Sequence, residues 1–156
     1  MADMLVSLLD LPDVGNLYDN LKAEGIEIRR ACTPNKFQIV EWVKAHSGLR
    51  GASECDTCFS HHPVSCFIAV QGNEIIGYAC YNSTAPDFFG PTRVLDSMQG
   101  KGVGKALLLA CLQSMRECGY IYAIIGGIGP REFYIKTVNA IDIPGSTPGL
   151  YKNVLK

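Results

Sequence analysis

A short segment rich in glycine and lysine stands between two regular elements of the chain. Residues Gln99–Lys105 read Gln-Gly-Lys-Gly-Val-Gly-Lys, and apolar residues at 103, 107, 111 and 115 then repeat every four positions. This repeat predicts a helix from Gly102 to Cys118. A helix N-terminus offers unpaired backbone N–H groups and about half a positive charge. Since glycine has no Cβ to obstruct the backbone, the segment predicts a site for an anion.

Spacing excludes two common nucleotide-binding loops. A P-loop needs glycine at position 99 and serine or threonine at 106, where this chain has Gln99 and Ala106. A dinucleotide fingerprint starting at Gly100 needs glycine at 105, where Lys105 stands, and a carboxylate about 20 residues further on, which the chain lacks.

The pattern that fits is Q-x-x-G-x-G, met by Gln99, Gly102 and Gly104. Here the sequence resembles the GCN5-related N-acetyltransferase superfamily, in element order from Ile26 to Ala140. The resemblance implies that acetyl-CoA is the cosubstrate and that the preceding strand hydrogen-bonds its pantetheine arm through Thr92, Arg93 and Val94. It implies a pyrophosphate cradle made of Gln99, Gly100, Lys101, Gly102, Val103, Gly104 and Lys105.

Two further segments match the family. Tyr120–Ile125 is an apolar run without alternation, which predicts a strand buried on both faces; in the family this strand runs parallel to the earlier one and splays from it. Tyr134 lies in a segment similar to the family's F-Y-x-K, which implies a general acid for the departing thiolate. A plain core tyrosine is the competing interpretation.

Two positions depart from the family pattern. Gly127 stands where many members have asparagine, seven residues before the tyrosine, so that contact to the cofactor is in question. The helix that carries Tyr134 is expected to stop at Asn139 instead of at the usual Gly-Phe, because asparagine tolerates the left-handed conformation of a helix end.

The remaining patterns predict one α/β domain over residues 1–156, with a strand and helix at about 1–25 as an N-terminal extension. The order of its elements predicts a mixed sheet with helices on both faces. The family resemblance implies that this sheet is mostly antiparallel and splayed at its centre. A hairpin is expected around Gln71-Gly72-Asn73, and a polar surface loop over Gly51–Val64. A helix beginning at Thr33-Pro34 is expected to bury Phe37 and to end near Gly48.

Acetyl transfer to an amine also requires a base, because an alkyl amine of pKa about 10.4 is protonated at neutral pH. Asp87, on the strand before the loop, is the base candidate. Glu132, His61 and His62 remain alternatives that the sequence does not separate.

Cys55 and Cys58 have the C-x-x-C spacing of a zinc knuckle, and His61, His62 and Cys66 follow them. A second ligand pair with the spacing of a ribbon or finger is missing. The expectation is therefore that no metal binds and that this loop lines the acceptor side. The chain has seven cysteines, several of them inside apolar patterns, which argues against a disulfide framework.

Composition limits the partners. Fourteen basic and fifteen acidic residues give a net charge of -1, which favours neither nucleic acid nor an anionic membrane. Apolar runs are shorter than the roughly 20 residues of a membrane span, so a cytoplasmic protein is expected. The apolar residues of the tail 144–156 are expected to cover a sheet edge or a partner, which leaves a homodimer open.

The leading hypothesis is an N-acetyltransferase acting on a small primary amine; the alternative is a catalytically silent CoA or acyl-CoA sensor.

Overall fold

The computed structural model describes residues 1–127 and 129–156. Its sheet is built from seven strands: β1 (Met4–Ser7), β2 (Ile26–Arg30), β3 (Cys66–Gln71), β4 (Glu74–Tyr81), β5 (Phe88–Val94), β6 (Tyr122–Ile125) and β7 (Ile141–Asp142). Its α-helices are α1 (Leu17–Ala23), α2 (Lys36–Cys58), α3 (Val103–Glu117) and α4 (Arg131–Val138). Three 3-10 helices complete it: η1 (Thr33–Asn35), η2 (Asp96–Met98) and η3 (Gly149–Asn153). None of the described helices combines the length and apolarity needed to span a membrane.

The strands form one sheet in the order β2-β3-β4-β5-β6-β1-β7. Among the described strands only β5 and β6 pair in parallel, and their register holds Phe88 opposite Ile124 and Phe89 opposite Ile125. Beyond Phe89, β5 continues along β4 alone, so the sheet opens between β5 and β6. The predicted mixed sheet, splayed at its centre, is confirmed.

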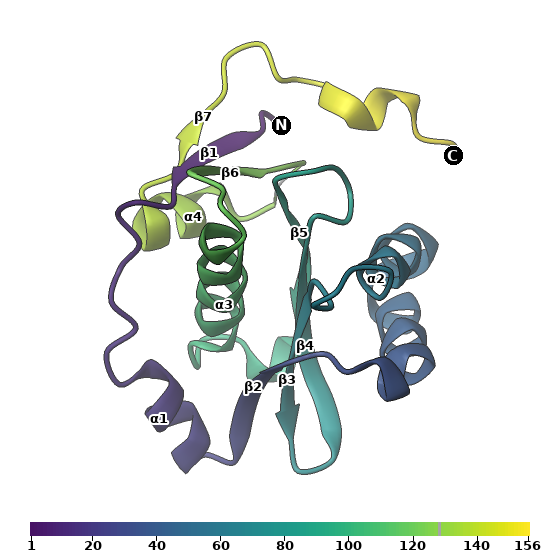
Figure 1. Cartoon of the computed structure of the whole chain (residues 1–156), viewed down its shortest axis with the longest axis vertical. Helices are drawn as coiled ribbons and strands as arrows, with labels where there is room; N and C mark the ends of the chain where they lie inside the picture. The colour runs from purple at the N-terminus through teal and green to yellow at the C-terminus, as the bar shows by residue number, and fades with distance from the viewer. Residues whose placement is uncertain (128) are drawn as a thin grey trace.

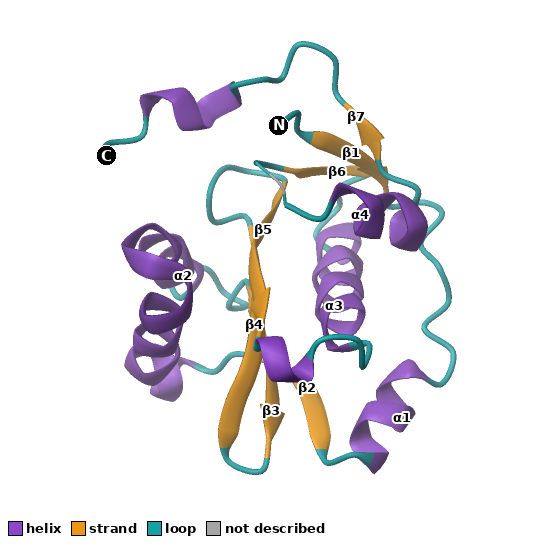
Figure 2. Ribbon diagram, turned by 180° about the vertical axis from the view of Figure 1, so that it is seen from behind, coloured by secondary structure: helices purple, strands orange, loops and turns teal. Residues whose placement is uncertain are grey.

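Helices cover both faces of the sheet, as predicted. Figure 1 shows α3, α1 and α4 on one side and α2 on the other, and Figure 2 shows the same layers from behind. Each side has its own apolar core. Leu107, Cys111 and Met115 of α3 are fully buried in the first, and Ile39 and Val43 of α2 are buried in the second. The four-residue repeat predicted for α3 is thus the stripe that faces the sheet.

The ends of the chain also lie in the sheet. β1 pairs antiparallel with β6 on one side and with β7 on the other, and Val6 is fully buried. The predicted N-terminal extension therefore supplies an interior strand. After β7 the tail crosses toward the side that carries α2 (Figure 1).

The prediction of a loop over Gly51–Val64 was wrong for its first half, because α2 extends to Cys58. Gly48 interrupts this helix with φ of 78° and ψ of -176°, after which the helix resumes. Buried residues on the second half are Gly51, Ala52, Cys55 and Cys58, which recur at helical spacing. Gly48, which was predicted to end the helix, is therefore the site of a kink, because the apolar face of the second half packs on the sheet.

Three local expectations were also wrong, and one was confirmed. Phe37 is 78% exposed, because α2 faces the sheet through Ile39 and Val43 instead. α2 does not begin at Thr33-Pro34, because these residues lie in η1, and α2 begins at Lys36. β6 is not buried on both faces, since Tyr122 is 51% exposed. Asn139 has φ of 55° and ends α4 in the left-handed conformation, as predicted.

Candidate functional site

The glycine-rich segment forms the turn into α3. Gly102 is the N-cap of this helix in the left-handed conformation, with φ of 91°, and no side chain among the described residues caps the helix end. α3 is 15 residues long, so its first N–H groups carry the positive end of a full helix dipole. This geometry suits an anion held by the backbone.

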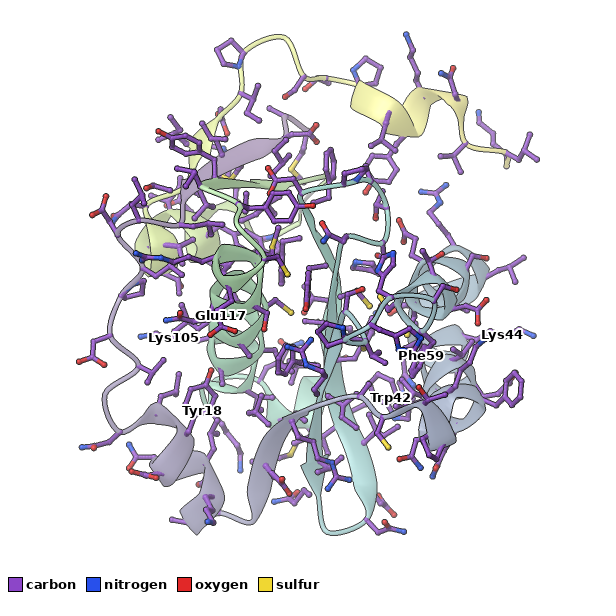
Figure 3. All side chains as sticks on the ribbon, viewed as in Figure 1. Tyr18, Trp42, Lys44, Phe59, Lys105 and Glu117 are labelled. Atoms are coloured by element: carbon purple, nitrogen blue, oxygen red, sulfur yellow. The ribbon has the colours of Figure 1, made fainter. Side chains whose placement is uncertain are left out.

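The side chains of the segment are engaged elsewhere or lie in solvent. Gln99 donates from Nε2 to Oδ1 of Asp96 at 3.2 Å, which shapes the turn. Val103 is 1% exposed and belongs to the core. Lys105 is exposed on the first turn of α3 and extends away from the sheet (Figure 3). The segment therefore offers a ligand its backbone amides, beside the exposed ammonium group of Lys105.

A cleft of about 610 Å³, which we call the β5 cleft, opens where β5 separates from β6. Eight of the ten residues predicted to bind the cofactor line it: Thr92, Arg93, Val94, Gln99, Gly100, Gly102, Gly104 and Lys105. The other two, Lys101 and Val103, belong to the same turn but do not line it. Along this cleft the described strands pair with β5 on one side only, so its other edge can pair with an extended ligand.

A second space of about 550 Å³, the α2 hollow, lies on the other side of β5. Its walls come from α2, from the segment after β6 and from the tail. They include Arg50, Glu54, Gly127, Pro148 and Tyr151. The β5 cleft and the α2 hollow share four lining residues, which are Phe89, Thr92, Pro130 and Tyr134. A ligand in one space can thus meet a ligand in the other beside Tyr134.

Tyr134 is held rigidly at this junction by α4. Its side chain is 4% exposed and packs edge-on against Phe89 and Phe133, with ring centroids 6.3 and 5.1 Å away. Burial, and to a lesser degree the nearby Cys111, raises the pKa of Tyr134 to about 12. The phenol therefore keeps its proton at neutral pH, as a proton donor must.

Glu54 of α2 is the carboxylate that lines the α2 hollow, and the sequence prediction missed it. Its Oε1 accepts a hydrogen bond of 2.6 Å from the Thr84 hydroxyl, which fixes its orientation. The residue falls in the stretch predicted to be a loop. The helical spacing of Gly51, Ala52, Cys55 and Cys58 is the sequence signal that places it on a helix.

The structure does not bring Asp87 to Tyr134. Asp87 lines neither the β5 cleft nor the α2 hollow. It begins the turn into β5 with φ of 66°, and its backbone N–H donates to Oδ1 of Asn82 at 2.8 Å. Its own Oδ1 is buried without a partner among the described residues, and burial raises the pKa of this carboxyl.

The other base candidates also lie apart. His61 and His62 line a different hollow, beside Cys118, and Nδ1 of His61 is 2.8 Å from Oγ of Ser65. Glu132 is exposed and lies 3.8 Å from the Arg131 guanidinium. Of the carboxylates considered, Glu54 is the one that faces a space shared with Tyr134.

The tail of the chain explains why a glycine stands at position 127. A Cβ at this position would lie 2.6 Å from the Tyr151 ring, so the ring occupies the room that a side chain needs. The Gly127 N–H donates to Oδ1 of Asp3 at 3.1 Å, which ties this segment to the residue just before β1.

We predict that Gly127→Asn displaces Tyr151 and lowers the free energy of unfolding by about 1–3 kcal/mol, as overpacking does. Asparagine tolerates the local φ of 56°, so contact with the ring is the cause. Denaturant unfolding of Gly127→Asn, Tyr151→Ala and the double variant tests this as a double-mutant cycle. Strictly additive losses would show that the ring is not the obstacle.

The model of the acetyltransferase (GNAT) family matches residues 26–130, more than half of the chain. The chain belongs to the acetyltransferase (GNAT) family. The match covers the strands β2 to β6 with the glycine-rich turn, and it ends just before α4 and Tyr134. A search of curated proteins found no significant match.

Solved structures share the GNAT fold with this chain at low sequence identity. The glucosamine N-acetyltransferase region of a fungal multi-domain GH3 β-N-acetylglucosaminidase has a TM-score of 0.72 at 10% identity, over 91% of this chain and 19% of that one. A GCN5-related N-acetyltransferase from Sphaerobacter thermophilus has a TM-score of 0.64 at 17% identity, over 91% and 48%. A GNAT acetyltransferase from Brucella melitensis, in complex with acetyl-CoA, has a TM-score of 0.52 at 19% identity, over 69% and 80%.

Proposed function

We propose that this GNAT-family chain transfers an acetyl group from acetyl-CoA to a primary amine of a small molecule. The observation that carries the proposal is the junction of two spaces at Tyr134, one beside the glycine-rich turn and one beside Glu54. A transfer between two substrates needs such a junction, because the donor and the acceptor bind in separate spaces and their reacting atoms must come into contact.

The β5 cleft suits acetyl-CoA. The backbone amides at the start of α3 would hold its pyrophosphate, and the free edge of β5 along Thr92–Val94 would pair with its pantetheine arm. This arrangement directs the thioester toward Tyr134, which lines the same cleft. No protein side chain takes the acetyl group in this proposal.

The α2 hollow suits the amine. At about 550 Å³ it has the size of a small-molecule pocket, and the tail residues Pro148 and Tyr151 wall it on one side. Glu54 attracts an ammonium group and, directly or through water, accepts the proton that the amine must lose.

The reaction is a direct transfer. The neutral amine nitrogen forms a bond to the acetyl carbonyl carbon while the carbon–sulfur bond breaks. Before the attack, the first proton of an ammonium substrate passes through Glu54 to solvent. As the amide forms, the nitrogen releases its second proton to Glu54 and the Tyr134 phenol gives its proton to the departing thiolate. The proton on Glu54 then returns to the Tyr134 phenolate through water, so that one proton in total is released to solvent. The raised pKa of Tyr134 keeps the donor loaded at neutral pH.

The proposal is tested by following thiol release from acetyl-CoA with a panel of polyamines, amino acids, amino sugars and aryl amines. Binding of acetyl-CoA is measured in parallel by calorimetry. Turnover with at least one small amine supports the proposal. Tight binding without turnover across the panel would instead favour an acyl-CoA sensor.

Glu54→Gln is expected to lower kcat by about 100-fold or more, because the amide is nearly isosteric but accepts no proton. The matched control is Asp56→Asn on the same helix, whose carboxylate lies in solvent, 3.0 Å from Lys36. Steady-state kinetics with the best amine compare the two. Equal activity of Glu54→Gln and the unmodified chain would remove Glu54 from the mechanism.

A further inference from the structure

A cluster of thiols lies in the second core, away from the transfer site. The Sγ atoms of Cys55, Cys66 and Cys80 all lie within 4.8 Å of one another, and each of the three residues is fully buried. They come from three elements, α2, β3 and β4. Cys66 stands directly opposite Cys80 in the antiparallel β3–β4 pair, and Cys55 approaches this pair from the helix.

A fourth thiol adjoins the cluster. Cys58 follows Cys55 by three residues on α2, which places it on the same helix face, and it is also fully buried. Its thiol lies outside the group of three mutually close sulfurs and donates to the backbone carbonyl oxygen of Glu54 at 3.8 Å. A C-x-x-C pair on a helix therefore faces a cross-strand pair of cysteines.

This convergence differs from the ligand set considered in the sequence. His61 and His62 line a separate surface hollow. Cys80, which the sequence analysis did not consider as a ligand, lies beside Cys55 and Cys66 instead. The four sulfurs are soft donors without an oxygen among them, a set that selects Zn²⁺ or similar thiophilic ions. Closed sites with four protein ligands are typical of structural zinc.

We propose that Cys55, Cys66 and Cys80 bind one Zn²⁺ ion and that Cys58, once its thiol turns away from the Glu54 carbonyl, closes this structural site as the fourth ligand. Each thiol that ligates the ion releases its proton to solvent, and no electron transfer is involved. Because all four side chains are fully buried, the ion enters during folding, and a chelator removes it from the native protein only slowly. The site fastens the second half of α2, which carries Glu54, to strands β3 and β4.

The test uses the full chain, unfolded under reducing conditions and refolded with Zn²⁺, with Co²⁺ or with a chelator. Elemental analysis of the zinc-refolded protein is expected to give about one zinc per chain. Refolding with Co²⁺ is expected to give the thiolate-to-cobalt charge-transfer absorption and the visible bands of a tetrahedral site. The thermal midpoint is expected to rise by about 5 °C or more over the chelator-refolded sample.

Cys80→Ala is compared with Cys111→Ala, a control at a cysteine that is equally buried but lies on α3. Cys111→Ala should retain the cobalt spectrum and the metal-dependent midpoint, and Cys80→Ala should lose both. If Cys80→Ala fails to fold, refolding of the unmodified chain with zinc, cobalt or chelator still tests the proposal. Identical midpoints with zinc and with chelator, together with a featureless cobalt spectrum, would overturn the proposal, as would a mass showing these thiols joined in disulfides.

Discussion

Replacing Gly104 by glutamate is expected to weaken acetyl-CoA binding at least about 100-fold, a loss of about 2.7 kcal/mol or more. Gly104 lines the β5 cleft in the first turn of α3, where we propose that the backbone amides bind the pyrophosphate. A carboxylate there places a negative charge beside the one proposed for the ligand. The same carboxylate stabilises the helix, because acidic residues are favourable at a helix N-terminus. Binding and folding are therefore expected to change in opposite directions.

The structure makes Gly104 a better test position than its neighbour Gly102. A Cβ at 104 meets nothing nearer than Val94 Cγ2 at 3.8 Å, whereas a Cβ at 102 would lie 2.9 Å from Leu17 Cδ1 on a backbone with φ of 91°. Gly104→Ala is the matched control and should bind acetyl-CoA with a small loss. Calorimetric titration measures the affinity, and thermal unfolding checks the fold. Unchanged affinity in a folded Gly104→Glu protein would refute the assignment of this turn to the pyrophosphate.

Tyr134→Phe is expected to lower kcat by about 100- to 1000-fold, the range of a lost general acid, with little change in acetyl-CoA affinity. Removal of the hydroxyl leaves the ring, its edge contacts with Phe89 and Phe133, and the shape of both spaces. A loss confined to kcat would thus report proton transfer and not packing.

Tyr122→Phe is the control for this variant, because Tyr122 is half-exposed on β6 and lines neither the β5 cleft nor the α2 hollow. Steady-state kinetics with acetyl-CoA and the best amine of the panel provide the comparison. If Tyr134→Phe keeps full kcat, Tyr134 is a core tyrosine and the thiolate takes its proton from water.

Local features of the fold were predictable because they depend on neighbouring residues. The repeat at 103, 107, 111 and 115 determined α3 and its buried stripe. Asn139 ended α4 as its tolerance of positive φ predicted. The β3–β4 hairpin likewise followed from the glycine in its turn. In each case the favourable backbone conformation and the apolar spacing lie within one element, where sequence distance and spatial distance agree.

The second half of α2 was predicted as a loop, so the residues that it contributes to the candidate site were not predicted. Gly48 was expected to end α2, but packing of Cys55 and Cys58 in the second core stabilises a second helical half beyond it. That half carries Arg50 and Glu54 to the α2 hollow. Propensity favours a stop at glycine by only about 1 kcal/mol, which burial of an apolar face outweighs.

The sequence by itself determined the glycine-rich turn and the helix that follows it, because these residues are close in the chain and their conformation is local. Only the tertiary structure determined which residues from distant parts of the chain lie near this turn and helix. It joined Glu54 and Tyr151 around one hollow and placed Cys80 beside Cys55 and Cys66. It also inserted β1 between β6 and β7. The physical reason is strand order, since the pairing of a sheet brings together side chains that no spacing along the chain relates.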